Sequence, residues 1–490
     1  MSSYLHGAYG QIQAVGNRVA ASSEGVIVYV GTAPVHNTFG AAKRVNRPVL
    51  VHNIQEARNL FGYSEDWASY TLCEAMHVHL EQKGVGPIVL INVLDPAVHK
   101  KGTSGTSTVT PSGGRAVISG AGDIVLDTIA VTGKTKGEDY TVGYDPEKEI
   151  VTLYETSSGS LGTNALTVTY DIVDASLVTA ANVIGTTDGQ GLNTGLYAVR
   201  SVYPVTGRVP AYLAVPGFSS VKSVHDAMAE ISVKINAHWD AYMFVDLPLA
   251  NGQTPLTLAT VAAYKASNGY DKPNETVYFP MAAGTDGKKY HISVLAAANF
   301  QELLLSQEGV PYRTASNTAC PVIQNLYMGE DNVNRVYDDE IINEFLNKNG
   351  IASAAFVGGR WAIWGAHSAD YTAEDGDYIN VAETNRMMLF YISNDFQRRR
   401  TFDVDKPMTA NDLQSIVKEE QGRLDALKKI GALTYGVVLL DASSVNGSDV
   451  MNGDFTFAFE VTTTPLAKSL KAIVNWTDDG FITYFEGLTA

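Results

Sequence analysis

Residues 211–216 (AYLAVP) and 242–247 (YMFVDL) are short, continuous apolar stretches, and each predicts a strand buried on both faces. The stretch between them, residues 220–237, predicts a helix, and residues 257–267 predict the next one. Strands that alternate with helices at this spacing indicate a parallel sheet with right-handed crossover connections. These residues therefore assign the chain to the α/β class.

The same pattern occurs near the start of the chain. Residues 25–31 (GVIVYVG) and 87–94 (PIVLINVL) again predict buried strands. A helix is expected between Asn53, which can cap its first turn, and Gly62, which can end it. The first 24 residues are small and polar, so they are either a frayed terminus or an arm that pairs with another subunit.

Between these two α/β stretches the composition changes. Residues 101–114 are mostly Gly, Ser, Thr and Lys, and they predict a linker or long loop. Short strands with turn signals between them follow, which indicates a small β-sandwich inserted into the α/β framework. The expected strands are residues 124–131, 140–144, 150–154 and 166–173.

The last third of the chain predicts helices and then strands. Helices are expected at residues 338–349, 378–400 and 412–430. Residues 455–462 (FTFAFEVT) have the period-two pattern of a half-buried strand. The residues on its apolar face are Phe455, Phe457, Phe459 and Val461.

A final strand is expected at residues 481–485 (FITYF), after a turn at residues 477–480. A strand at this position needs a sheet edge for its unpaired N–H and C=O groups. That edge lies either in the same chain or in a neighbouring copy, as in β-strand addition, and we favour the neighbour. The residues that would make this contact are Phe481, Ile482, Tyr484 and Phe485.

Composition limits the classes of protein to which the chain can belong. It has 490 residues and 45% apolar residues, enough for about three domains with real cores. Its net charge of −17 argues against nucleic-acid binding, which requires a basic face. No run of 18 apolar residues predicts a membrane span, and no secretory signal is recognised, so we expect a cytoplasmic site of synthesis. Cys73 and Cys320 fit reduced, buried thiols.

No motif specific for catalysis, a cofactor or a metal occurs, so we expect neither enzymatic activity nor a bound cofactor. His77 and His79 are two residues apart on a predicted helix, whereas zinc ligands on one helix are three or four apart. Asp246 and Asp271 lie at or beyond the ends of α/β elements, where ligand sites form, but carboxylates there are also common caps. A hydrolase that uses the α/β fold remains an alternative.

The basic run at the end of the second predicted C-terminal helix has two interpretations. Arg398, Arg399 and Arg400 either compensate the helix dipole or form a patch that meets an acidic neighbour. The acidic complement on another copy would be Glu374, Asp375 and Asp377, which could equally form a solvated loop.

Several short motifs, taken in their order along the chain, resemble the contractile phage tail sheath protein family, which also occurs in phage-tail-like particles such as R-type bacteriocins. The motifs are residues 6–10 (HGAYG), 46–50 (NRPVL), 56–57 (EA), 61–62 (FG), 213–217 (LAVPG), 358–366 (GGRWAIWGA), 377–381 (DYINV) and 427–433. The most specific is residues 358–366 with residues 377–381. His367 and Ser368 stand where the family typically has Arg-Thr, so the role of that arginine is not carried over.

The resemblance implies an α/β and α+β multidomain protein: a subtilisin-like α/β domain, an inserted small β-sandwich, and an α+β C-terminal sheath domain with terminal β-arms. The expected divisions are an N-terminal arm at residues 1–24, an α/β segment at 25–98, the insert at 99–197, the subtilisin-like domain at 198–355, the C-terminal domain at 356–475 and a C-terminal arm at 476–490.

The resemblance also implies a function. Sheath subunits form stacked hexameric rings around an inner tube and contract, which drives the tube through a cell envelope. The implied partners are further copies of the chain, the inner tail tube protein, and baseplate and tail terminator proteins, without nucleic acid or membrane insertion. The implied location is the tail of a virion or phage-tail-like particle made in a bacterial cytoplasm. A capsid or inner tube subunit is a second alternative.

Two sets of contact residues follow from the resemblance. The N-terminal arm would pair with a neighbour through Tyr9, Gln11, Ile12 and Val15, in addition to the aromatic strands near the C-terminus. The helix of residues 412–430 would face the inner tube. Its contact residues would be Glu419, Glu420, Arg423, Lys428 and Lys429.

Overall fold

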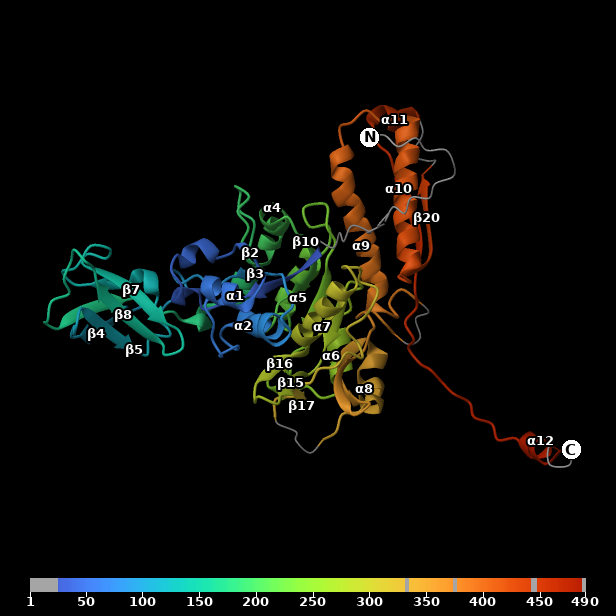
Figure 1. Ribbon diagram of the computed structural model, residues 1–490, viewed down its shortest axis with the longest axis horizontal. Coiled ribbons are helices and arrows are strands. Elements are labelled where there is room, and N and C mark those ends of the chain that lie inside the picture. The colour runs from blue at the N-terminus through green and yellow to red at the C-terminus, as the bar shows by residue number, and fades with distance from the viewer. Residues whose placement is uncertain (1–24, 331–334, 373–376, 442–446, 487–490) are drawn as a thin grey trace, which may run out of the picture.

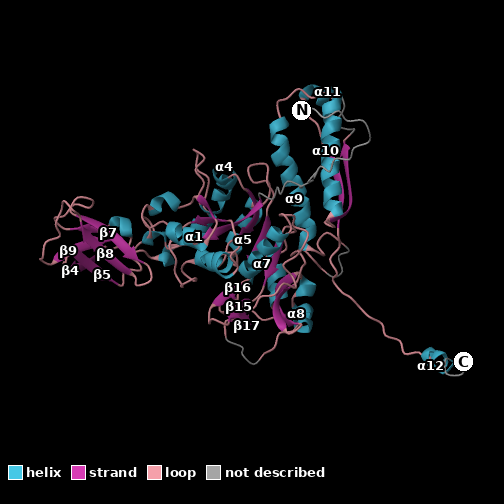
Figure 2. Cartoon of the chain, viewed as in Figure 1, coloured by secondary structure: helices cyan, strands magenta, loops and turns pink. Residues whose placement is uncertain are grey.

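A computed structural model describes residues 25–330, 335–372, 377–441 and 447–486. Its centre is an eight-stranded sheet with the strand order β19-β18-β14-β11-β10-β1-β3-β2 (Figures 1 and 2). Neighbouring strands from β18 to β3 are parallel, and the edge strands β19 and β2 are antiparallel to their neighbours. The strands are β1 (Gly25–Gly31), β2 (Pro48–Val51), β3 (Ile88–Asn92), β10 (Val209–Ala214), β11 (Tyr242–Asp246), β14 (Glu275–Tyr278), β18 (Ile351–Val357) and β19 (Arg360–Trp364). The predicted parallel sheet is confirmed.

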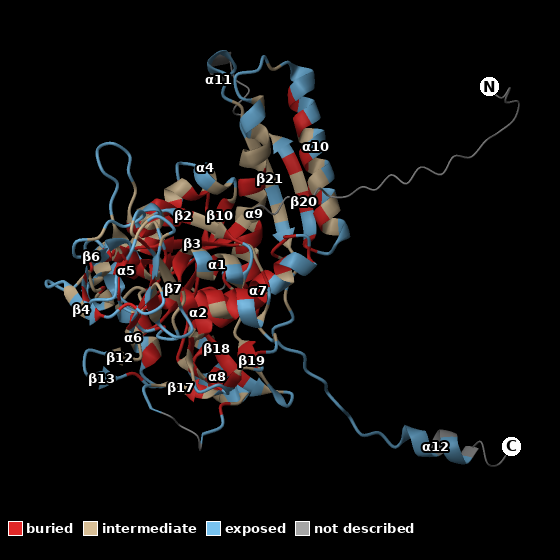
Figure 3. Cartoon of the chain, turned by 60° about the vertical axis from the view of Figure 1, so that its left-hand side comes forward, coloured by how far each residue is buried: buried red, intermediate tan, exposed pale blue. Residues whose placement is uncertain are grey.

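Every residue of β11 and β14 is buried, although the side chains of a strand alternate between the two faces of its sheet. Helices therefore cover both faces of this sheet. Figure 3 shows the buried strands lying among the helices. The helices of this body are α1 (Ile54–Phe61), α2 (Thr71–Ala75), which continues as a π-helix over Met76–Gln82, α3 (Ala180–Ile184), α4 (Val202–Thr206), α5 (Lys222–Ile231), α6 (Val261–Ser267), α7 (Ile292–Ser306) and α8 (Asp339–Phe345).

The predicted boundaries of α1 are confirmed. The Asn53 side chain accepts a hydrogen bond of 2.9 Å from the backbone N–H of Glu56, and Gly62 ends the helix with φ of 73°. Two small sheets lie beside the body: β15 (Met281–Gly284), β16 (Lys289–His291) and β17 (Ile323–Tyr327), and the hairpin of β12 (Ala250–Asn251) and β13 (Thr254–Pro255).

Two three-stranded sheets form a separate unit that projects from the body at the end opposite to helices α9 and α10 (Figure 1). Their orders are β4-β9-β6 and β5-β8-β7, and both contribute to one core that includes Ile118, Leu153 and Val168. The strands are β4 (Gly105–Val109), β5 (Arg115–Ser119), β6 (Ala130–Val131), β7 (Tyr140–Asp145), β8 (Ile150–Glu155) and β9 (Leu166–Tyr170). We call these residues, 105–170, the inserted unit.

The prediction of a linker at residues 101–114 is wrong. Residues 105–109 form β4, which pairs along its length with β9. The exposed Thr106 and Thr108 alternate there with Gly105, Ser107 and the buried Val109, and a β-strand tolerates this pattern when a partner strand satisfies its backbone.

The chain ends in a unit that stands beside the body (Figure 1). It contains α9 (Glu383–Arg400), α10 (Ala410–Lys429), β20 (Leu433–Leu440) and β21 (Phe457–Thr463), and we call these four elements the C-terminal unit. The short α11 (Gly447–Asn452) lies between β20 and β21 in the sequence. The predicted division at residue 356 falls inside β18, and β19 is still part of the central sheet, so we place the division at the start of α9.

The prediction of a strand at residues 481–485 is also wrong. Those residues lie in α12 (Asp479–Glu486), whose first turn is bonded by the Thr477 hydroxyl. Without a paired strand, a helix is the conformation that satisfies backbone groups within the segment itself. Among the residues that the structure describes, no helix has both the length and the apolar character needed to cross a membrane.

Candidate assembly surface of the C-terminal unit

The strands β20 and β21 form an antiparallel pair whose inner face packs on the two long helices. The register places Val438 opposite Phe459 and Gly436 opposite Val461. The ring of Phe396 on α9 lies 5.3 Å from the ring of Phe459, in an edge-to-face contact. The predicted strand at residues 455–462 therefore exists with a shift of its start to residue 457, but it pairs within the chain.

The outer edge of β20 is closed by a side chain of α10. The amide of Gln421 donates to the carbonyl oxygen of Gly436 at 3.1 Å and accepts from the N–H of Val438 at 2.9 Å. These are the two bonds that a neighbouring strand would make with residues i and i+2. Gln421 thus occupies the place of a third strand beside β20.

The outer edge of β21 is open. In an antiparallel pair, residues that oppose one another without mutual hydrogen bonds both direct their N–H and C=O groups away from the partner strand. Because Gly436 and Val438 point toward Gln421, their opposites Val461 and Phe459 point outward on the far side of β21. No third strand joins this sheet among the described residues, so the row of groups is available for another chain.

The C-terminal segment beyond β21 leaves the body in an extended form (Figures 1 and 3). Its last anchor is Lys468, whose ammonium group donates to the hydroxyl of Tyr371 at 2.6 Å. The ring of Tyr371 stacks on His367 with 3.7 Å between ring centres, and burial lowers the pKa of that histidine. Past this anchor, Val474 is 91% exposed and Trp476 is 80% exposed.

This segment is a strand-forming sequence that sequence reasoning missed. Leu470, Ala472, Val474 and Trp476 are apolar and alternate with the polar Lys471 and Asn475, and Ile473 interrupts this alternation. The pattern is close to the period-two signal of a half-buried strand, and all of these residues are exposed. The signal was obscured by the stronger aromatic pattern of residues 481–485.

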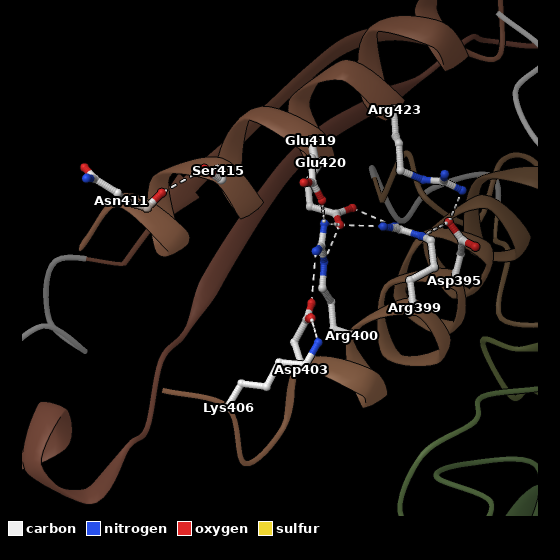
Figure 4. A network of polar contacts seen from close by, with 10 residues as sticks. All are labelled: Asp395, Arg399, Arg400, Asp403, Lys406, Asn411, Ser415, Glu419, Glu420 and Arg423. Atoms are coloured by element: carbon white, nitrogen blue, oxygen red, sulfur yellow. Dashed lines mark hydrogen bonds and ion pairs between the residues drawn. The ribbon is translucent and has the colours of Figure 1, made fainter. Parts of the chain in front are cut away.

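An ionic cluster joins α9 to α10 (Figure 4). The carboxylate of Glu420, which is 1% exposed, lies 2.6 Å from Nη2 of Arg399 and 2.8 Å from Nε of Arg400. Burial raises the pKa of Glu420, but the hydrogen bonds from the two arginines outweigh it and the net pKa lies below its ordinary value. Across the same interface, Arg423 donates to Asp395 at 2.6 Å.

These contacts bear on the predicted charge patches. Arg399 and Arg400 bond to Glu420, and Arg398 contacts Asp395, so the basic run helps to hold the C-terminal unit together, and its contact with a neighbouring copy stays a prediction. Of its predicted acidic complement, Glu374 and Asp375 lie outside the described residues, and the carboxylate of Asp377 accepts from the backbone of Ile379.

The predicted tube-contact set on α10 divides in two. Glu420 is buried in the ionic cluster, whereas Arg423 takes part in the cluster with 29% of its side chain exposed. Glu419 and Lys428 reach the surface, although each has an ion-pair partner in the chain, and Lys429 is exposed. For Arg423 and these three residues tube contact stays a prediction. The predicted residues of the N-terminal arm, Tyr9, Gln11, Ile12 and Val15, lie outside the described residues.

The polar groups of the body form a structural network. Asp246 ends β11, and its carboxylate accepts hydrogen bonds from the hydroxyl and the N–H of Ser293 at the start of α7. Nδ1 of His291 lies 2.6 Å from Glu74; burial lowers the pKa of His291, but Glu74 raises it to about 9 overall. Because Glu74, Asp246 and Ser293 are buried, a substrate would have no access to this cluster.

The other candidates from the sequence are separated in space. His79 is buried and bonds to the hydroxyl of Tyr29, whereas His77 lies against Glu81, and Asp271 pairs with its neighbour Lys272. In the described part of the chain, no group of three or more histidine, cysteine or carboxylate side chains is placed to hold a metal ion. Cys73 and Cys320 are free and buried, as predicted.

Comparison with known proteins supports the resemblance seen in the sequence. The chain is 25% identical to the tail sheath protein of Burkholderia phage BcepMu over an alignment of 508 positions, which covers 98% of each protein. The chain is similar to contractile tail sheath proteins over almost its whole length. No protein-family model matches it.

Solved structures share the fold of this chain. A chain of the anti-feeding prophage baseplate, solved with sixfold symmetry, aligns over 98% of the present chain and 100% of its own, with 13% identity and a TM-score of 0.56. A chain of the PVC sheath complex, an extracellular contractile injection system in its contracted state, aligns over 98% and 99% with 12% identity and a TM-score of 0.54. The sheath tail protein of Desulfitobacterium hafniense aligns over 94% and 100% with 10% identity and a TM-score of 0.50.

Proposed function

We propose that the protein is the structural subunit of a contractile tail sheath. It polymerises as stacked hexameric rings around an inner tube and contracts to drive the tube through a cell envelope. The observation that carries this proposal is that one chain holds both halves of a joint: the open edge of β21 and an exposed strand-forming segment. The relative from phage BcepMu and the PVC sheath complex support the same role.

The joint is β-strand addition between copies. Residues 469–477 of one subunit add to the outer edge of β21 of a neighbour, in place of the predicted strand at residues 481–485. Each outward-facing residue of β21 offers one donor and one acceptor, so the three at positions 457, 459 and 461 supply about six backbone hydrogen bonds, or about 6 kcal/mol. The apolar residues of the arm add about 1.5–3 kcal/mol for each large side chain that they bury.

These gains are close to the cost of association, which is about 4–15 kcal/mol for two proteins. A single joint is therefore weak, and a ring that closes several joints at once is stable. This balance suits a subunit that stays monomeric until it meets a template. The N-terminal arm would pair with the strand added to β21, since Gln421 occupies the edge of β20.

The other units receive roles consistent with this joint. The body is the subtilisin-like domain without proteolytic activity, and the inserted unit is the predicted β-sandwich. The partners are the inner tail tube protein, through the exposed face of α10, and the baseplate and tail terminator proteins. The protein is made in the cytoplasm of a bacterial host and becomes part of a virion tail or phage-tail-like particle.

Electron microscopy of purified variants, with and without an inner tube as template, tests the proposal. Wild-type protein should form hollow, striated sleeves, and deletion of residues 464–490 should leave folded monomers. Trp476→Asp should prevent assembly, because it places a charge on the apolar face of the arm. Its neighbour Asn475 lies on the other face, so Asn475→Asp introduces the same charge and should assemble normally. Sleeves from the Trp476→Asp variant would contradict the joint.

A further inference from the structure

The short terminal helix α12 carries an apolar face that is mostly exposed, with the ring of Trp476 beside it at 6.5 Å from the ring of Phe481. Phe481, Tyr484 and Phe485 are three and four residues apart, so they lie on one side of the helix. Their exposed fractions are 59%, 69% and 58%. Figures 1 and 3 show α12 at the far end of the extended segment, away from the body and the C-terminal unit. Three aromatic rings in water mark a contact surface.

A second apolar surface that no described residue covers lies on the β20 half of the outer face of the β20–β21 pair, beside Glu460 and Thr462 of β21. Tyr435, Val437 and Leu439 alternate with the inward-facing residues of β20, so their side chains point away from α10. Tyr435 is 48% exposed and Leu439 is 47% exposed. Leu439 lies opposite Ala458 of β21, and the small side chain of Ala458 leaves room for a helix to pack on this face.

We propose that these two surfaces cover one another between copies: α12 of one subunit packs on the outer face of the β20–β21 pair of the neighbour that accepts its arm. The inference rests on the proposed function, because it needs the arm to pair with β21. It extends that function, because α12 would act as a lid: its packing would hold the end of the added strand, in addition to the hydrogen bonds along the strand's edge.

The tether between strand and helix selects this site. Three residue steps separate Trp476, the last apolar residue of the arm strand, from Asp479, the first residue of α12. They span at most about 11 Å, so α12 must begin next to the strand end on the acceptor subunit. Neighbouring strands are about 4.8 Å apart, which places the outer face of β20 within reach of the helix. Helix α10 covers the inner face of β20, where Leu424 lies against Gly436.

Disulfide trapping between two different single variants tests the contact. Phe485→Cys protein is mixed with Leu439→Cys protein, assembled into sleeves and oxidised. Only a contact between copies can link the two variants, and both native cysteines are buried. The control replaces Leu439→Cys with Leu177→Cys, a leucine of similar exposure, 45%, that lies outside the C-terminal unit. We expect a linked dimer with Leu439→Cys and its loss with Leu177→Cys.

Sleeves without a linked dimer, or equal linkage at both leucines, would overturn the lid. Deletion of residues 479–490 gives a second readout: it should raise the critical concentration for assembly at least about tenfold, the contribution of one buried aromatic ring. An unchanged critical concentration would also count against the lid. The proposed joint has its own test, because only deletion of residues 464–490 removes the arm strand. If that deletion prevents sleeves while the lid tests fail, the joint stands and the lid is wrong.

Discussion

Replacing Glu420 by glutamine should loosen the contact between α9 and α10 while it preserves the shape of the side chain. Removal of one partner of a buried ion pair costs about 3–5 kcal/mol. Here Arg399 keeps Asp395 and Arg400 keeps Asp403, so we expect about 2–3 kcal/mol, just below that range.

Hydrogen exchange of the α10 amides measures this loss locally, which matters because a multidomain chain has no single unfolding free energy. A loss of about 2–3 kcal/mol corresponds to exchange that is about 30- to 150-fold faster. The matched control is Glu419→Gln, since Glu419 also bonds to Arg400 but its side chain is 63% exposed. An exposed pair contributes about 0.5 kcal/mol, so the control should change exchange by about twofold. Equal effects of the two substitutions would refute the reasoning.

The same group gives a pH dependence with a defined sign. The pKa of Glu420 is lower in the folded chain than its ordinary value of 4.5, so its contribution is fully present above pH 4.5. The contribution is lost as the pH falls below 4.5 and through the folded pKa. Protection of α10 should therefore decrease with acid in the wild type, and this component should be missing in Glu420→Gln.

Other substitutions test separate features. Gln421→Leu should reduce the protection of β20 against hydrogen exchange by about 1–2 kcal/mol. It should also increase light scattering, because the newly opened edge of β20 promotes aggregation. Gln414→Leu, on the exposed face of α10, should do neither. Burial raises the pKa of Glu383 to about 6, so the free energy of unfolding decreases as the pH rises from 4.5 to about 6. Glu383→Gln should remove this decrease and stabilise the start of α9 at pH 7 by up to about 2 kcal/mol, measured by hydrogen exchange. Charge reversal of Lys428 and Lys429 should weaken co-sedimentation with the inner tube without affecting the fold, and unchanged binding would exclude this face of α10.

The α/β body could be predicted from the sequence because its strands are buried on both faces. Residues 242–247 are apolar without interruption, which occurs when helices cover both sides of a parallel sheet. Local signals were equally reliable at α1, where Asn53 and Gly62 act within one turn of the residues that they terminate. These features depend on neighbours in the sequence.

The candidate site depended on contacts that the sequence does not display. In the sequence, the run Arg398–Arg400 has the pattern of a free basic patch. Only the fold brings Glu420 of α10, twenty residues beyond Arg400, into contact with it. Phe481, Tyr484 and Phe485 fit a strand and a helix alike, and the choice depends on whether a sheet edge is present. The closure of β20 by Gln421 has no local signal, because a glutamine on a helix is ordinary until its amide meets a strand.

A short ladder marks where the chain enters and leaves the inserted unit, and side contacts hold the unit against the body: the ring of His36 bonds to the carbonyl oxygen of Gly122 at 2.9 Å, and the N–H of Gly40 donates to Asp127 at 2.9 Å. Lys101 donates to the carbonyl oxygen of Ile172 at 2.8 Å, and Asp174 donates to that of His99 at 3.0 Å, so the chain enters and leaves side by side. In the proposed sleeve, tension that runs along the backbone from one subunit to the next crosses this ladder and bypasses the strands beyond it. The strands of the inserted unit then carry none of this backbone tension. Sequence changes in its loops would therefore leave the transmission of force along the chain unchanged.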